Sequence, residues 1–231
     1  LAGRKSTYLR LVVEGEGEVP LLLICSALIK GWDPARIPGV RRFPADGGPS
    51  QRSRLDHNLD LLVPPTLDGL DLSVYRCPFP GVRPGATVPY QFIVGCPQRC
   101  SYCNITDQGR YKLRSVPLVI SDLERMQGDY GVKQFFFLNS AINTDIRYNQ
   151  ALLDAMLARK RSWRWADCAR PQNYDQDYFL RMKRAGCETL TWGFDTSSPR
   201  LNARYRRGLS REDFARLLRT AHGAGIRNGV N

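Results

Sequence analysis

Three of the seven cysteines, Cys96, Cys100 and Cys103, lie within one eight-residue stretch. Thiolates are suitable ligands for iron–sulfur clusters and for zinc. Three thiolates on a four-iron cluster leave one iron without a protein ligand, and that iron can chelate the amino and carboxylate groups of a methionine-like molecule. The triplet therefore predicts a 4Fe-4S cluster that donates an electron to a bound sulfonium.

A structural metal site is the alternative for the same cysteines. Zinc requires four closed ligands, which usually come from two separated pairs. His57 and His222 are isolated, so only Cys77 could complete such a set, and the ligand count favours the cluster. The lone cysteines Cys25, Cys77, Cys168 and Cys187 are each expected to be small buried apolar residues.

The elements that must position the triplet begin after Pro89, where strands and helices alternate. Strands are expected at residues 90–94, 134–138, 163–168 and 188–194, and a fifth starts near Ile226. Helices are expected from Ser121, around residues 152–157, and at 176–185 and 211–222. Four βα repeats and one opening strand predict an α/β fold with a parallel sheet, curved as part of a barrel. Reactive groups of such folds lie at the carboxyl ends of the strands, and the triplet follows the first predicted strand.

The N-terminal part is organised differently. Residues 8–13 are expected to form a strand, and an acidic, glycine-rich turn leads from it into an apolar helix over residues 19–30. Prolines and glycines then recur from Gly31 to Pro89 with little periodicity, which indicates a linker or a set of ordered loops.

The stretch from Gly95 to Cys103 resembles the signature of the radical S-adenosylmethionine superfamily. Its three cysteines are separated by three and then two residues, and the aromatic Tyr102 directly precedes the last one. The resemblance implies that the three cysteines bind a 4Fe-4S cluster, that S-adenosylmethionine takes the fourth iron, and that Tyr102 is a cofactor-binding residue. Reductive cleavage would then yield methionine and a 5'-deoxyadenosyl radical, which abstracts hydrogen from a substrate.

The same resemblance implies further cofactor-binding positions after each later strand. Asn139 and Asn143 lie where the family places groups that hold the methionine amino group, although the usual Gly-Gly-Glu is absent. The stretch containing Asp195 and Thr196 is similar to the family's Gly-x-Glu-Ser, which contacts the ribose. The basic positions that can face the carboxylate of S-adenosylmethionine are Arg170 and Arg207.

The upstream segment is similar to the end of the cobalamin-binding domain found in cobalamin-type radical enzymes. The similarity rests on the acidic glycine turn at residues 14–18 and on residues 59–65 and 70–75, which resemble that family's linker. It implies three parts: a tail of a doubly wound cobalamin-binding domain at 1–45, a linker at 46–89, and a C-terminally truncated radical core at 90–231. Cobalamin would belong to a longer parent protein, and the isolated fragment is expected to be inactive.

The charge distribution bears on the partners. The net charge is +12; residues 1–90 carry 11 basic and 9 acidic side chains, whereas residues 91–231 carry 23 and 13. Solvated arginine-rich helix faces explain this excess better than a nucleic-acid surface does. No apolar run suits a membrane span or a signal peptide, so a cytoplasmic protein is expected. The family implies a small-molecule or peptide substrate and an external one-electron reductant such as flavodoxin or ferredoxin.

Three functions remain open from the sequence. The upstream segment favours a cobalamin-dependent methyltransferase. The basic excess favours a radical methylthiotransferase or related enzyme that acts on tRNA or protein. A non-catalytic protein with a structural metal and a nucleic-acid-binding half is the third.

Overall fold

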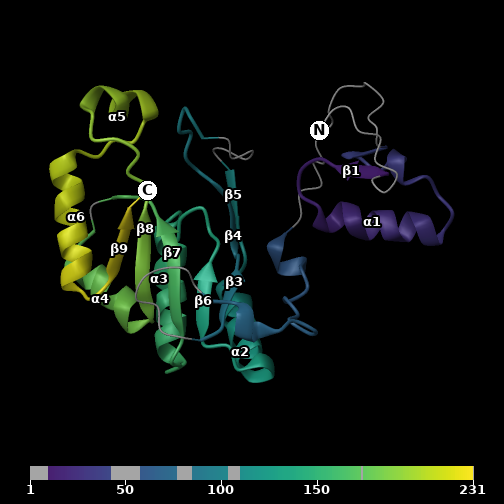
Figure 1. Ribbon diagram of the computed structural model, residues 1–231, viewed down its shortest axis with the longest axis horizontal. Helices are drawn as coiled ribbons and strands as arrows, with labels where there is room; N and C mark the ends of the chain where they lie inside the picture. The colour runs from purple at the N-terminus through teal and green to yellow at the C-terminus, as the bar shows by residue number, and fades with distance from the viewer. Residues whose placement is uncertain (1–9, 43–57, 77–84, 104–109, 173, 231) are drawn as a thin grey trace. The chain divides into compact units, whose positions relative to one another are not determined.

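The computed structural model describes residues 10–42, 58–76, 85–103, 110–172 and 174–230. Contacts within the chain divide it into two compact units, Leu1–Asn58 and Leu59–Asn231. Figure 1 shows the helices and strands of both units. Within the described ranges, no helix is long and apolar enough to cross a membrane.

The N-terminal unit contains strand β1 (Leu11–Val13), helix α1 (Glu18–Ile29) and strand β2 (Val40–Arg42). The expected strand and helix are present, while β2 was not expected and pairs antiparallel with β1. Helix α1 is apolar on nearly every side, so much of its apolar surface stays exposed in this unit. Cys25 lies on an exposed side of α1, and the expectation that it is buried is wrong.

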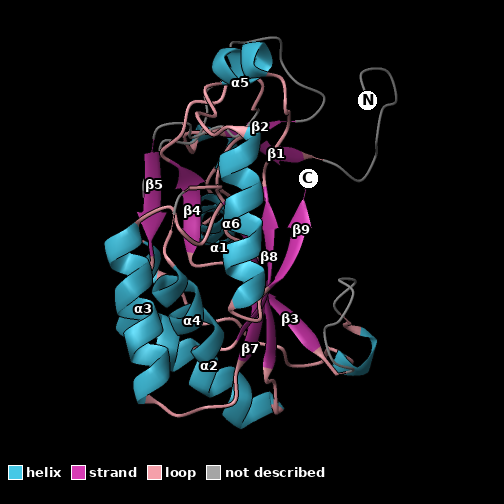
Figure 2. Ribbon diagram, turned by 90° about the vertical axis from the view of Figure 1, so that its left-hand side faces the viewer, coloured by secondary structure: helices cyan, strands magenta, loops and turns pink. Residues whose placement is uncertain are grey.

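The second unit is built on a five-stranded parallel sheet. Its strand order is β3 (Thr87–Tyr90), β6 (Gln134–Phe137), β7 (Arg164–Ala169), β8 (Cys187–Trp192) and β9 (Arg227–Val230). The helices between the strands are α2 (Val116–Tyr130), α3 (Ile146–Ala158), α4 (Gln176–Arg184) and α6 (Arg211–Gly223), and they lie along one face of the sheet (Figure 2). Four βα repeats and a bare fifth strand are confirmed. The sheet is open, with β3 and β9 as its edges.

The apolar core lies between this sheet and its helices. Phe137 and Trp165 stack with ring centroids 5.4 Å apart, and Phe179 of α4 meets Trp192 edge to face at 6.1 Å. Because side chains alternate along a strand, the neighbouring positions point to the opposite face. That inner face carries small or polar residues in register with one another: Ala166, Cys168, Thr189, Thr191 and Gly229.

The predicted strand at residues 90–94 is wrong, because the chain divides there between two sheets. Strand β3 ends at Tyr90, and β4 (Ile93–Cys96) pairs antiparallel with β5 (Arg110–Leu113), which was not expected. Proline inside a strand is tolerated at a sheet edge, where its missing N–H faces away from the ladder. Pro89 therefore belongs to the edge strand β3 and does not precede it.

The expected helix start at Ser121 is also wrong. Helix α2 begins at Val116, with Ser115 as its N-cap residue and Pro117 in its first turn. Ser115 makes no side-chain cap; instead its backbone amide donates to Oδ1 of Asp60 at 2.7 Å. The cap thus comes from a residue 55 positions away, which a local sequence pattern does not reveal.

Candidate active site

The cysteine triplet lies at the tip of the antiparallel pair β4–β5, called the cysteine hairpin below. Cys96 is the last residue of β4 and stands opposite Arg110, while the amide of Cys103 donates to the carbonyl of Cys100 at 3.2 Å. Gly95 has a φ of +84°, and a Cβ there would come within 2.5 Å of the Arg110 carbonyl oxygen. Glycine is the residue that fits this left-handed backbone and the close approach of the Arg110 carbonyl. Gly95 therefore allows the backbone conformation of β4 that directly precedes Cys96.

Burial and nearby cations act in opposite directions on the thiols. Burial raises the pKa of the Cys96 thiol, and the neighbouring Cys100 and Cys103 raise it further, whereas the Gln98 amide and the Arg170 guanidinium lower it. Arg207 Nη1 lies 3.6 Å from Sγ of Cys100, which is buried. The guanidinium groups of Arg170 and Arg207 therefore lie near the cysteine thiols. Cations of this kind stabilise thiolates.

Three cysteine thiolates are a suitable donor set for a four-iron cluster. Within the described residues, no three His, Cys, Asp or Glu side chains converge as ligands of one metal ion. Each thiolate of a four-iron cluster binds a different iron, so its cysteines need not meet at one point. Cys77, on which the structural zinc alternative depended, lies outside the described residues.

Arg207 joins the cysteines to the loop after β8. Its Nη2 forms an ion pair with Oδ2 of Asp195 at 2.7 Å and also donates to the carbonyl of Gly193. The hydroxyl of Tyr102 hydrogen bonds to Asp195, and both burial and this carboxylate raise the pKa of Tyr102. The predicted residues Tyr102, Asp195 and Arg207 therefore form one connected group with Cys100.

The short helix α5 (Pro199–Tyr205), which the sequence did not predict, places Arg207. The rings of Tyr102 and Tyr205 meet edge to face at 4.9 Å, and Ser101 Oγ donates to the carbonyl of Arg204 at 3.1 Å. Helix α5 thus packs against the cysteine turn. The sequence contains only a weak signal for it, the Ser198-Pro199 pair, which is typical of an N-cap followed by a first helical residue.

A shallow hollow opens beside this group at the carboxyl end of the sheet, and its empty space of about 250 Å³ includes open solvent. Predicted site residues Arg170, Asp195, Thr196 and Arg207 line it. Nη1 of Arg170 is buried and has no hydrogen-bond partner within the described part of the protein. An unpartnered guanidinium nitrogen is well suited to bind an anionic group such as a carboxylate.

The two predicted asparagines are not among the residues that line this hollow, and they bond to the chain itself. Asn143 accepts from the Arg170 amide at 2.9 Å and donates to the Arg170 carbonyl at 2.7 Å, so it orients that arginine. Asn139 Oδ1 accepts from the amides of Phe92 and Ile93 at 3.2 and 2.8 Å. Both amide groups are thus engaged within the protein, and their predicted contact with the methionine amino group stays a prediction.

Asp167 is a buried carboxyl group that the sequence did not single out. Its two oxygens accept from Nδ2 of Asn139 and from the amide of Cys168, each at 2.7 Å. Complete burial raises the pKa of Asp167 well above its ordinary value, while the accepted hydrogen bonds lower it. The single Asp inside an apolar strand pattern was the only signal available.

Comparison with known proteins identifies the family of the chain. The sequence model described as "Radical SAM superfamily" matches residues 90–231, which is more than half of the chain. The chain therefore belongs to the radical S-adenosylmethionine superfamily, a superfamily of enzymes. Membership implies a 4Fe-4S cluster and S-adenosylmethionine as cofactors, for which the cysteine turn and the adjoining hollow have suitable residues.

Individual relatives are more distant. The chain is 27% identical over 237 residues to "Uncharacterized methyltransferase PH0819" of Pyrococcus horikoshii, covering 98% of this chain and 49% of the relative. It thus spans about half the length of that curated relative.

Solved structures share the fold. The radical S-adenosylmethionine methyltransferase TsrM from Kitasatospora setae, solved with cobalamin and a [4Fe-4S] cluster, has a TM-score of 0.72 at 24% identity, over 96% of this chain and 45% of TsrM. The cobalamin-dependent radical enzyme OxsB, solved with aqua-cobalamin, has a TM-score of 0.75 at 18% identity, over 95% of this chain and 33% of OxsB.

Proposed function

We propose that this chain is the part of a cobalamin-dependent radical methyltransferase that holds the 4Fe-4S cluster and most of the S-adenosylmethionine site. The observation that carries the proposal is the connected group of Cys96, Cys100 and Cys103 with Arg207 and Asp195 beside an anion-ready hollow. When bound, the cluster supplies one electron that breaks the C5'–S bond of S-adenosylmethionine, yielding methionine and a 5'-deoxyadenosyl radical.

The residues of the chain bind and orient in this proposal. The three cysteines hold the cluster through their thiolates. Arg170, whose Nη1 is unpartnered within the described residues, binds the methionine carboxylate, and Asn143 keeps it in place. Asp195 accepts the ribose hydroxyls, and Arg207 fixes the direction of its carboxylate.

Methyl transfer through cobalamin is supported by relatives rather than by a site in this chain. TsrM is described as a methyltransferase and OxsB as cobalamin-dependent, and the Pyrococcus relative is named a methyltransferase. We assign residues 1–45 to the end of the corrinoid-binding domain, 46–89 to the linker and 90–231 to the radical core, with the linker from Leu59 onward packed into the same compact unit as the core.

The partners follow from this chemistry. The electron comes from an external one-electron donor such as flavodoxin or ferredoxin, and the substrate is a small molecule or a peptide. No disulfide joins the six described cysteines, which supports a reducing, cytoplasmic setting. The methylthiotransferase and nucleic-acid alternatives rest on the basic excess alone.

Anaerobic reconstitution with iron and sulfide tests the proposal. We expect four irons per chain and an electron paramagnetic resonance signal that changes when S-adenosylmethionine is added. Cys100→Ala should abolish the signal, whereas Cys25→Ala, which removes an exposed cysteine of the other unit, should leave it intact. Zinc in place of iron, or a cluster indifferent to S-adenosylmethionine, would contradict the proposal.

A further inference from the structure

The cysteine hairpin needs an anchor, because β4 and β5 pair only with each other and not with the five-stranded sheet. Its base is bonded to the sheet at Phe92. The Phe92 amide donates to Oδ1 of Asn139 at 3.2 Å, and its carbonyl accepts from the amide of Arg114 at 2.9 Å. Arg114 directly follows β5, so it stands at the point where the hairpin leaves the body of the protein.

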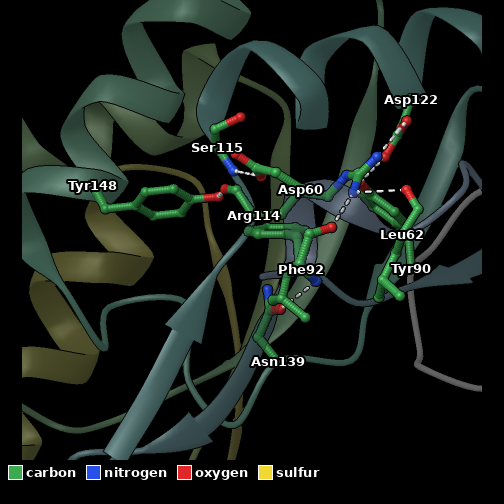
Figure 3. Close-up of polar contacts among 10 residues, drawn as sticks. Asp60, Leu62, Tyr90, Phe92, Arg114, Ser115, Asp122, Asn139 and Tyr148 are labelled. Carbon is green, nitrogen blue, oxygen red and sulfur yellow. Dashed lines mark hydrogen bonds and ion pairs between the residues drawn. The ribbon is translucent and has the colours of Figure 1, made fainter. Parts of the chain in front are cut away.

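The side chain of Arg114 is buried and ion-paired, with 6% exposure against 2% for its partner Asp122 on α2. Nε donates to Oδ2 of Asp122 at 2.8 Å and Nη2 to Oδ1 at 3.4 Å, a two-point contact (Figure 3). The Tyr90 hydroxyl donates to the same carboxylate at 2.5 Å. The carboxylate thus joins the guanidinium at the hairpin base to the end of β3.

The remaining nitrogen of the guanidinium reaches a segment far away in sequence. Nη1 donates to the carbonyl of Leu59 and, at 3.2 Å, to that of Leu62. The same segment supplies Asp60, which caps α2 by accepting from the amide of Ser115 at 2.7 Å (Figure 3). Residues 59–62 are the first residues of the second unit, so the chain enters this unit at the base of the cysteine hairpin.

Helix α3 holds the hairpin from another side. The Tyr148 hydroxyl donates to the carbonyl of Arg114 at 2.6 Å, and the Tyr111 hydroxyl donates to Oδ2 of Asp145 at 3.0 Å. Arg114 is therefore bonded through its backbone and its side chain to four elements: the hairpin, α2, α3 and the entering segment. A buried ion pair is often neutral for stability relative to apolar packing. Holding the hairpin in position therefore explains the Arg114–Asp122 ion pair better than a contribution to stability does.

We propose that Arg114 is a positioning residue of the radical site, acting on the cluster ligands through the hairpin; this rests on the proposed function above. Arg114 lies four positions after Arg110, which faces Cys96, so the two residues are roughly 13 Å apart along a strand. A small shift at the base of a stiff hairpin moves its tip by a similar or larger distance. The guanidinium thereby sets where the three thiols stand relative to Arg170, Arg207 and the hollow.

Hydrogen exchange in the full chain tests the anchor without any cofactor. Arg114→Lys keeps a positive charge toward Asp122, but it cannot bond to Asp122 at two points and to both backbone carbonyls as well. We expect the amides of residues 91–96 and 110–115 to exchange on the order of tenfold faster. Arg125→Lys, an exposed arginine of α2 paired with Asp129, is the matched control and should exchange like the wild type. Wild-type exchange in Arg114→Lys would overturn the proposal.

The reconstituted protein tests the consequence for the site. Arg114→Lys should retain four irons per chain but need on the order of tenfold more S-adenosylmethionine to change the resonance signal. The double variant Arg114→Met/Asp122→Leu separates positioning from stability, because it removes the charges together and restores apolar packing. We expect the melting temperature of the double variant to return to that of the wild type. The double variant should still need more S-adenosylmethionine than the wild type to change the resonance signal.

A full recovery of that response in the double variant would show a merely structural role and sink the proposal. A wild-type protein that never responds to S-adenosylmethionine would instead contradict the proposed function. In that case the exchange comparison still decides whether Arg114 anchors the hairpin.

Discussion

Arg207 is the residue on which the candidate site depends most, because one guanidinium contacts Cys100, Asp195 and Gly193 together. A hydrogen bond that involves a charged group contributes about 1.5–3 kcal/mol. Removing this group frees the Asp195 carboxylate to turn away from the hollow. It also removes a cation from beside the cysteine turn.

We therefore expect Arg207→Met to weaken S-adenosylmethionine binding by about 10- to 100-fold without abolishing cluster assembly. Arg204→Lys is the control, because the Arg204 side chain is exposed on the neighbouring helix α5 and only its carbonyl contacts the cysteine turn. The measurement is a titration of the reduced, reconstituted protein followed by electron paramagnetic resonance. Equal affinities for both variants would contradict the expectation.

Asp167 predicts a pH dependence of stability. Its folded pKa is raised above the unfolded value of about 3.9, so its contribution is complete below that value and is lost as pH rises toward the folded pKa. In that window, the unfolding free energy of the wild type should fall relative to Asp167→Asn by about 1.4 kcal/mol per pH unit. Urea denaturation of the apoprotein from pH 4 to pH 8 measures the difference.

A difference between the wild type and Asp167→Asn that stays constant over the whole range would show that the carboxyl group does not titrate with a raised pKa.

At the residue scale, the sequence predicted most of the residues of the candidate site. The spacing of Cys96, Cys100 and Cys103 predicts a cluster directly, and the family resemblance implies site roles for Arg170, Asp195 and Arg207. Arg114 could not be found in this way, because its partners at Leu59 and Leu62 are more than 50 positions away. Contacts of this kind depend on the folded arrangement and leave no local pattern.

At the scale of elements, helices with strong apolar spacing and local caps were predictable. Helix α6 begins where Ser210 accepts from the amide of Asp213 at 3.0 Å, and α4 begins at a similar cap formed by Asp175. The cysteine hairpin was not predictable, because antiparallel pairing of β4 with β5 depends on residues on both sides of the turn. A short apolar run at 90–94 therefore resembled one strand although the structure contains parts of two.

A substitution at Gly95 tests whether the cysteine hairpin is needed for iron loading. Gly95→Ala introduces a Cβ into a left-handed backbone and against the Arg110 carbonyl, which should destabilise the hairpin and reduce iron loading several-fold. Gly128→Ala is the matched control, because a Cβ at that position of α2 meets nothing within 4 Å. That variant should be unchanged or up to about 1 kcal/mol more stable. Normal iron loading in Gly95→Ala would show that the hairpin tolerates the side chain.

At the scale of the whole molecule, contacts divide the chain at Asn58 and Leu59, and residues 59–76 belong to the second unit although they were predicted as linker. The amide of Thr87 donates to the carbonyl of Tyr75 at 2.9 Å, and Tyr130 donates to Asp68 at 2.8 Å. The composition of this segment, rich in proline and glycine, describes its lack of regular structure. It does not reveal that the segment packs on the sheet unit.

We expect residues 59–231, produced as a separate chain, to fold with a melting temperature within a few degrees of the second unit in the longer chain. A chain that starts at residue 90 should melt at a clearly lower temperature, because it loses most of the edge strand β3 as well as Asp60 and both carbonyl partners of Arg114. Circular dichroism melting curves compare the two. Identical stability would show that residues 59–89 do not contribute to the unit.

The inner face of the sheet has a consequence for how such an enzyme can diversify. The aromatic packing that stabilises the unit lies on the outer face, whereas Ala166, Cys168, Thr191 and Gly229 project to the other side. Substitutions at these positions can reshape what the sheet faces while the packed aromatic layer stays intact. Selection for a new substrate could therefore proceed on one side of the sheet largely independently of selection for folding on the other.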